Sequence, residues 1–316
     1  MKFVVYGAGA VGGLVGGLLH RAGHDVILIA RGAHLEALRS DGLHLLSPTL
    51  DERLPVPAVA GPEDVDWRGD EVVLVAVKSD ATADVAARLS RVAPAVSVVS
   101  LQNGVANEPT LSRWFSDVYA VCVMAPATHL SPGVVVGKSG GVPAILDVGR
   151  WPTGTDETTA AIAAAFTDAG IVSEPRADIM AWKYRKLLMN LGNAVDACCV
   201  DDDAADRLVD ALRAEADEVL AAAGVEVVSE PDDRVRRGDL LRRGNTPAPP
   251  GGSTWQSLAR GTGSVETDYL NGEIVMNARR LGVPAPLNER VQRLAAAMAV
   301  DGRPPRSVDA RTLLAD

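Results

Sequence analysis

The first twelve residues, MKFVVYGAGAVG, constrain the fold more than any other stretch of this chain. A short apolar run ends in Gly7, and Gly9 and Gly12 complete the pattern G-x-G-x-x-G before a stretch of helical period. In a strand–loop–helix setting the first glycine makes a tight turn, the second lets backbone approach a pyrophosphate, and the third lets the helix pack on the sheet. The pattern predicts a dinucleotide-binding loop; the alternative is a glycine-rich turn in another α/β protein.

Further apolar, β-branched runs follow this loop and alternate with helical stretches. They lie at 24–31, 70–78 and 95–104, and they predict a parallel, doubly wound sheet. Between 118 and 150 the pattern changes to short β segments with Gly and Pro turns, which we interpret as edge strands and hairpins.

From about residue 176 the strand signals stop, and the chain becomes rich in Ala, Leu and Arg with helical periodicity. The expected fold is therefore α/β, with an N-terminal doubly wound sheet followed by an all-helical C-terminal domain. We expect a cofactor-binding domain at 1–174, a helical substrate and catalytic domain at 175–300, and a polar tail at 301–316.

The second strand indicates which cofactor the loop binds. NAD-binding folds place an acid at the end of this strand to bind the ribose 2′-hydroxyl. Here the strand ends in Arg31, and Asp25 lies at its other end. An arginine suits a 2′-phosphate, so NADP(H) is favoured. Lys78 closes a later strand and is a second candidate for the adenosine end; the alternative is a solvated charge.

Composition excludes several partners. A formal net charge of −10 argues against nucleic acid, and no apolar run reaches the about 18 residues of a membrane helix. Three cysteines without a C-x-x-C pair favour a reducing, cytoplasmic location. The second half has no histidine, which argues against a His-based acid or metal site there. A homodimer is compatible with the sequence, which does not fix the oligomeric state.

A polar stripe marks the helical stretch 181–195, AWKYRKLLMNLGNAV. Lys186, Asn190 and Asn193 recur at i, i+4 and i+7, which places them on one face of a single helix. The chain has only five lysines against 26 arginines, so a lysine here suggests a role that arginine fills badly, such as giving up a proton. Lys183 is the rival candidate, and a solvated surface face is the alternative.

The ordered set of motifs resembles the ketopantoate reductase (2-dehydropantoate 2-reductase) family over roughly residues 1–297. The resemblance rests on GAGAVG, Arg31, Lys78, QNG at 102–104, KLLMN at 186–190, and STWQSLARG followed by VETDYLNG at 253–272. It implies a Rossmann domain that binds NADPH, a helical domain that binds a small 2-oxo acid, and reduction of ketopantoate to pantoate in pantothenate biosynthesis.

The resemblance also assigns roles to residues. It makes Lys186 the catalytic lysine, puts Asn103 at the nicotinamide and the substrate, and gives substrate contacts to Asn190 and Ser253. Glu266 falls on the glutamate of the family's T-E-x-D-Y motif, where it would hold the ammonium or a ribose hydroxyl; the alternative is a surface salt bridge. Ser253 starts a helix, so an N-cap is its alternative. The expected cofactor-binding residues are Gly7, Gly9, Ala10, Val11, Gly12, Arg31, Lys78, Asn103 and Glu266.

Three departures from the family pattern concern the substrate pocket. The N-P-L-T stretch is NAVD here, so Asn193 matches loosely; Pro250 stands where an asparagine is common; and residues 200–206 read VDDDAAD. The substrate is accordingly less constrained than the chemistry. Two alternatives remain: a reductase of another small carbonyl or an imine, and a non-catalytic NADP(H)-binding regulator. His129, in a predicted turn, is expected to be an exposed loop residue.

Overall fold

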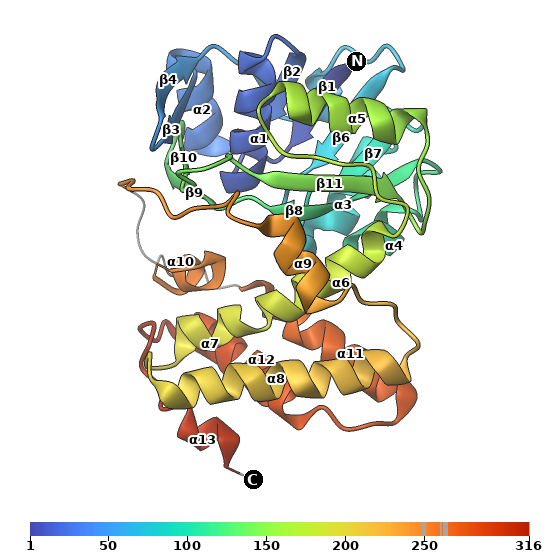
Figure 1. The fold of residues 1–316 in the computed structure, drawn as a ribbon. Helices are drawn as coiled ribbons and strands as arrows, with labels where there is room; N and C mark the ends of the chain where they lie inside the picture. Colours follow the sequence, from blue (N-terminus) through green and yellow to red (C-terminus); the bar gives the residue numbers. More distant parts are fainter. Residues whose placement is uncertain (248–250, 260, 262–264, 316) are drawn as a thin grey trace. The chain divides into compact units, whose positions relative to one another are not determined.

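The computed structural model describes residues 1–247, 251–259, 261 and 265–315, and it divides into two compact units (Figure 1). The first unit consists of residues 1–103, 107–183 and 229–248, and the second of residues 104–106, 184–228 and 249–316. This division differs from the expected 1–174, 175–300 and 301–316. The segments 175–183 and 229–248 belong with the sheet, and the tail belongs with the helices.

A seven-stranded sheet forms the centre of the first unit, as the alternating pattern predicts. The order is β11 (Ile145–Arg150), β8 (Val118–Met124), β7 (Ser97–Ser100), β6 (Glu71–Val75), β1 (Lys2–Tyr6), β2 (Asp25–Ile29) and β5 (Ala58–Val59). Neighbouring strands are parallel except β11, which runs antiparallel to β8. The doubly wound sheet is confirmed, but β8 lies inside the sheet rather than at its edge.

Helices cover both faces of this sheet. Because side chains alternate along a strand, Phe3 and Val5 of β1 join one core and Val4 and Tyr6 join the other. The first core is closed by α1 (Ala10–Arg21) and α5 (Glu157–Asp168), and the second by α3 (Thr82–Leu89) and α4 (Asn107–Leu111) (Figure 1). This double burial explains why these strands are apolar throughout.

A second, four-stranded sheet also belongs to the first unit. Its order is β4 (Leu50–Leu54), β3 (Leu43–Ser47), β10 (Val134–Gly137) and β9 (Ala127–Ser131). In the chain, β3 and β4 come directly after α2 (Gly32–Asp41). The hairpin β9–β10 accounts for part of the expected β segments. The expectation of an exposed loop histidine was wrong, because His129 lies half-buried on β9 and packs edge-on against His34, with ring centroids 4.4 Å apart.

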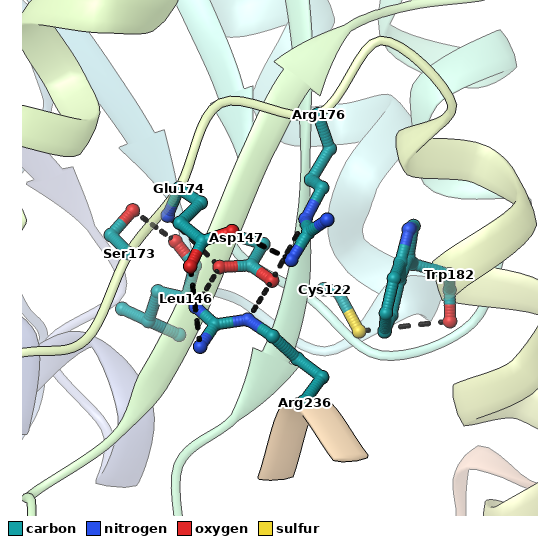
Figure 2. Close-up of polar contacts among 8 residues, drawn as sticks. All are labelled: Cys122, Leu146, Asp147, Ser173, Glu174, Arg176, Trp182 and Arg236. Atoms are coloured by element: carbon teal, nitrogen blue, oxygen red, sulfur yellow. Dashed lines mark hydrogen bonds and ion pairs between the residues drawn. The ribbon is translucent and has the colours of Figure 1, made fainter. Parts of the chain in front are cut away.

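The segment 229–248 is bound to β11 by a buried cluster of charges (Figure 2). It contains α9 (Glu230–Arg237), from which Arg236 donates two hydrogen bonds, of 2.8 and 2.6 Å, to the carboxylate of Asp147. Asp147 is 2% exposed and also meets Arg176 Nε at 3.4 Å. The carboxylate in turn raises the pKa of Arg236 above its usual value. The segment therefore belongs to the sheet unit although helices of the other unit flank it in sequence.

Helices make up the second unit. They are the end of α6 (Ile179–Asn190), α7 (Gly192–Cys198), α8 (Asp203–Ala222), α10 (Ser253–Ala259), the 3₁₀ turn η3 (Glu266–Tyr269), α11 (Asn271–Leu281), α12 (Pro286–Asp301) and α13 (Arg311–Leu314). α8 packs against α7, α11 and α12. The tail is not merely a polar extension, since Val308 forms a β-bridge with Cys199. No helix among the described residues is long and apolar enough to cross a membrane.

Candidate functional site

Four predicted site positions lie at one edge of the seven-stranded sheet. Tyr6, Ile29, Val75 and Ser100 are in register across β2, β1, β6 and β7, so these parallel strands end together. The glycine loop, Arg31, Lys78 and Asn103 follow directly after these strand ends. The strand order also reverses between β1 and β6, and open α/β sheets bind ligands outside the carboxyl ends of strands at such a point.

The glycine loop has the geometry that a nucleotide site requires. Gly7 has φ +106°, which disfavours any side chain, and its N–H donates to the carbonyl of Ile29. A Cβ on Gly12 would lie 2.1 Å from the Gly7 carbonyl oxygen, so only glycine lets the helix begin this close. A Cβ on Gly9 would instead meet nothing within 4 Å. Gly9 is thus not required by packing, and the open space beside it fits a pyrophosphate.

The backbone of Ala10 and Val11 forms the first turn of α1. The first N–H groups of a helix have no acceptor within it, and they face the positive end of the helix dipole. No acidic residue lies in this first turn, and Gly9 supplies no side-chain cap. The start of α1 therefore suits an anion, as the sequence pattern predicts.

Arg31 and Lys78 bring positive charge to the same edge. Both side chains are exposed; Arg31 is the residue before α2, and Lys78 is the residue before the 3₁₀ turn η2 (Ser79–Ala81). Asp25 begins β2 and so lies at the opposite edge of the sheet. The residues present fit a nucleotide with a 2′-phosphate, since the end of β2 offers a cation and no acid.

A buried polar network surrounds Asn103, and sequence reasoning missed most of it. Asn107 Nδ2 donates to the Asn103 carbonyl at 3.0 Å and to Ser79 Oγ at 3.2 Å. Lys183 donates to the Gln102 carbonyl at 2.9 Å and pairs with Glu108 at 2.6 Å. The sequence does show two polar residues, Asn107 and Glu108, shortly after the QNG motif. It does not show that Glu108 pairs with a lysine on a distant helix.

The polar stripe is carried by two helices rather than one. α6 ends at Asn190 and α7 begins at Gly192, a residue of low helix propensity, so Asn193 lies on a different helix from Lys186. Asn190 is 5% exposed, and Lys186 and Asn193 are half-buried. A solvated surface face does not describe Asn190.

Asn193 lies beside the start of α10 within the second unit. A Cβ on Gly252 would come 4.0 Å from Oδ1 of Asn193, and α10 packs against α7. α10 begins at Ser253, which agrees with the expected helix start, but the Ser253 side chain and Pro250 lie outside the described residues. The carboxylate of Asp196 accepts a long hydrogen bond, 3.5 Å, from the Gly252 N–H. This acid was not anticipated as a neighbour of the helix start.

Glu266 opens the 3₁₀ turn η3 and is half-buried. The backbone of Gly104, also in the second unit, comes close to this turn, since a Cβ there would lie 2.9 Å from the Tyr269 carbonyl oxygen. Gly104 has φ +79°, so both its conformation and its surroundings require glycine. Gly104, the glycine of the QNG motif, therefore lies next to Tyr269, the tyrosine of the TDY motif.

Comparisons with known proteins show which family this chain is similar to. A family model described as ketopantoate reductase PanE/ApbA matches residues 3–152, and the model of its C-terminal part matches residues 178–299. The 2-dehydropantoate 2-reductase of Archaeoglobus fulgidus is 33% identical over 298 residues, with 92% of this chain and 95% of the relative covered. That of Halobacterium salinarum is 31% identical, with 91% and 95% covered. The crystal structure of a PanE/ApbA family ketopantoate reductase from Ralstonia eutropha has a TM-score of 0.81 and 31% identity, covering 96% of this chain and all of that one.

Proposed function

Because this chain belongs to the ketopantoate reductase family, we propose that it reduces ketopantoate (2-dehydropantoate) to pantoate with NADPH. The observation that carries the proposal is the similarity, over nearly the whole chain, to relatives named 2-dehydropantoate 2-reductase. The motifs that the family shares are also present in order, from the glycine loop to VETDYLNG.

The two units carry different parts of the proposed work. In the first unit, the loop Gly7–Gly12, Arg31, Lys78 and Asn103 bind the cofactor, with the pyrophosphate at the start of α1 and the 2′-phosphate at Arg31. In the second unit, Asn190, Asn193 and Ser253 bind the 2-oxo acid, and the start of α10 receives its carboxylate. Glu266 holds a ribose hydroxyl or the lysine ammonium.

Lys186 supplies the proton in the proposed reaction. NADPH, when bound, supplies the hydride that reduces the C2 carbonyl of the 2-oxo acid. As negative charge builds on the carbonyl oxygen, the Lys186 ammonium stabilises it and then transfers a proton to it, which leaves a hydroxyl group. Asn190, one turn later on α6, is proposed to orient the substrate with hydrogen bonds that add no charge.

A panel of substrates tests the function directly. Purified protein is mixed with NADPH and each of ketopantoate, pyruvate, phenylglyoxylate, a simple ketone and a cyclic imine, and loss of reduced-nicotinamide absorbance is followed. Ketopantoate should give the highest kcat/KM. A higher value for another member of the panel would replace the substrate, and no turnover with any member together with tight NADPH binding would favour a regulator.

The cofactor preference yields a prediction for Arg31. Arg31→Ala should weaken NADPH binding by roughly ten- to a hundredfold, since a charge-assisted contact to phosphate contributes about 1.5–3 kcal/mol. NADH binding should hardly change, because NADH lacks the 2′-phosphate. Fluorescence titration with both cofactors provides the measurement. Arg39→Ala, in α2, the helix that begins directly after Arg31, is the matched control, since both side chains are exposed. Equal losses for NADPH and NADH would remove Arg31 from the phosphate site.

Location and assembly are proposed on narrower grounds. The three cysteines, Cys122, Cys198 and Cys199, are buried thiols rather than disulfides, which suits a reducing cytoplasm. A homodimer is proposed as the working assembly, and light scattering coupled to gel filtration tests it by the mass in solution.

A further inference from the structure

Lys183 is held in a buried site by two backbone carbonyls and one carboxylate. The side chain is buried, with the residue 3% exposed. Its Nζ lies 2.9 Å from the Gln102 carbonyl, 3.2 Å from the Val121 carbonyl and 2.6 Å from Glu108 Oε1. An ammonium has three N–H donors, and three protein oxygens surround this one. Lys183 is therefore fixed in place by contacts to three residues of the same unit.

One of the Lys183 contacts fixes the peptide group that joins Gln102 to Asn103. Lys183 holds the carbonyl of Gln102, and Asn107 holds the carbonyl of Asn103 itself at 3.0 Å. The Gln102 side chain is fixed as well, since its Nε2 donates to the Val77 carbonyl at 2.9 Å and to Thr82 Oγ1 at 2.8 Å. Two consecutive carbonyls at the site edge of the sheet are thus held by buried side chains.

Glu108 ties this arrangement to α4. Its side chain is completely buried and is the carboxylate partner of Lys183. The residue before Lys183 is held as well: Cys122 Sγ on β8 donates to the Trp182 carbonyl, and the Arg176 guanidinium lies 4.6 Å from the centroid of the Trp182 ring (Figure 2). The Lys183 ammonium therefore approaches Gln102 from an anchored helical turn.

A buried ion pair is an expensive way to obtain stability alone, because both groups lose their hydration and an apolar pair often serves as well. It is a good way to fix a geometry, because the charges tolerate few alternative arrangements. We propose that the Lys183–Glu108 pair is a positioning device that sets the backbone of Asn103, and through it the Asn103 side chain, for the nicotinamide and the 2-oxo acid. The inference rests on the proposed function, because it takes Asn103 to be a ligand of both.

The test is a double-mutant cycle between the pair and Asn103. Lys183→Met/Glu108→Gln removes both charges at similar volume and leaves no unpaired buried ion. If the pair acts through Asn103, this variant should lower kcat/KM by roughly ten- to a hundredfold, as expected for a displaced site group. Combined with Asn103→Ala, it should add little to the loss caused by Asn103→Ala alone.

A second buried lysine–glutamate pair supplies the control. Lys2 and Glu71 lie 3.6 Å apart at the amino ends of β1 and β6, where the opposite edge of the same sheet begins. Lys2→Met/Glu71→Gln should change thermal stability but leave kcat/KM and NADPH affinity near wild type. Glu108→Gln alone, which keeps an acceptor for Lys183 but removes its counterion, repeats the cycle if the double variant does not fold.

The NADPH dissociation constant, measured by fluorescence titration of the same variants, is the second measurement. The effect of the pair on this constant should also be non-additive with that of Asn103→Ala. The binding measurement tests the positioning role even if no 2-oxo acid is turned over. Absence of turnover would count against the proposed function only. Additive effects on log Kd and on log kcat/KM, or an equal loss of activity in the Lys2/Glu71 variant, would overturn the positioning role.

Discussion

Replacing Lys186 with alanine is expected to lower kcat by a factor on the order of 10²–10⁴, the usual contribution of a positioned general acid. The alkoxide that forms during reduction then has neither a nearby positive charge nor a proton donor. The NADPH dissociation constant should change little, because the proposed phosphate contacts lie in the glycine loop and at Arg31. Steady-state kinetics with the best substrate of the panel, together with a fluorescence titration, measure both quantities.

Two further variants make this result specific. Lys186→Arg should restore little activity, because guanidinium retains its proton too firmly to donate it. Arg185→Ala removes the adjacent cation on α6, which donates to the Val228 carbonyl, and should keep a near-normal kcat. Near wild-type turnover by Lys186→Ala would show that another group is the acid. Lys186 and Asn190 on α6 would then have no role in proton transfer.

Replacing Asp147 with alanine is expected to reduce the free energy of unfolding by about 3–5 kcal/mol, the range seen when one partner of a buried ion pair is removed. The change removes the buried carboxylate that Arg236 and Arg176 share and leaves them the more exposed Glu174, while Arg236 is largely inaccessible to water. It also removes the acceptor for the Glu174 N–H. Urea unfolding followed by circular dichroism gives the value.

The matched comparison uses an exposed ion pair on α9. Glu230→Gln breaks the contact with Arg234, one helical turn away on the surface, and should cost no more than about 0.5 kcal/mol. A double variant, Asp147→Asn/Arg236→Met, should recover part of the stability lost in Asp147→Ala because it leaves fewer buried groups unpaired. If Asp147→Ala were as mild as Glu230→Gln, the cluster in Figure 2 would not hold the segment 229–248 in place.

The arrangement around the glycine loop was predictable because its signals are local. Each of Gly9, Arg31, Lys78 and Asn103 follows an apolar run whose end is visible in the sequence, and parallel strands bring such ends to one edge. The cofactor preference followed from a single position, Arg31. For Lys186 and Asn190, helical spacing was enough to put both on one face of α6.

What the sequence could not reveal depends on contacts between distant residues. A lysine that closes a buried ion pair looks the same in sequence as one on an open helix face, so the sequence could not show that Lys183 pairs with Glu108. The helical pattern beyond residue 176 includes α9 (Glu230–Arg237), but a helical period carries no information about which core a helix joins. The helix is interrupted at the single residue Leu191, between α6 and α7, and hydrophobic periodicity does not locate an interruption of one residue.

The contact between Arg236 and Asp147 also dictates when the chain can finish folding. Domains usually fold in the order in which they leave the ribosome. Here the strands through β11 emerge early, but the arginine that neutralises Asp147 is encoded 89 positions later. Between those moments the whole of α8, a helix of the other unit, is synthesised. Until the segment 229–248 is synthesised, the nascent sheet lacks this arginine partner of Asp147, and a truncation that stops at Lys183 would lack it permanently.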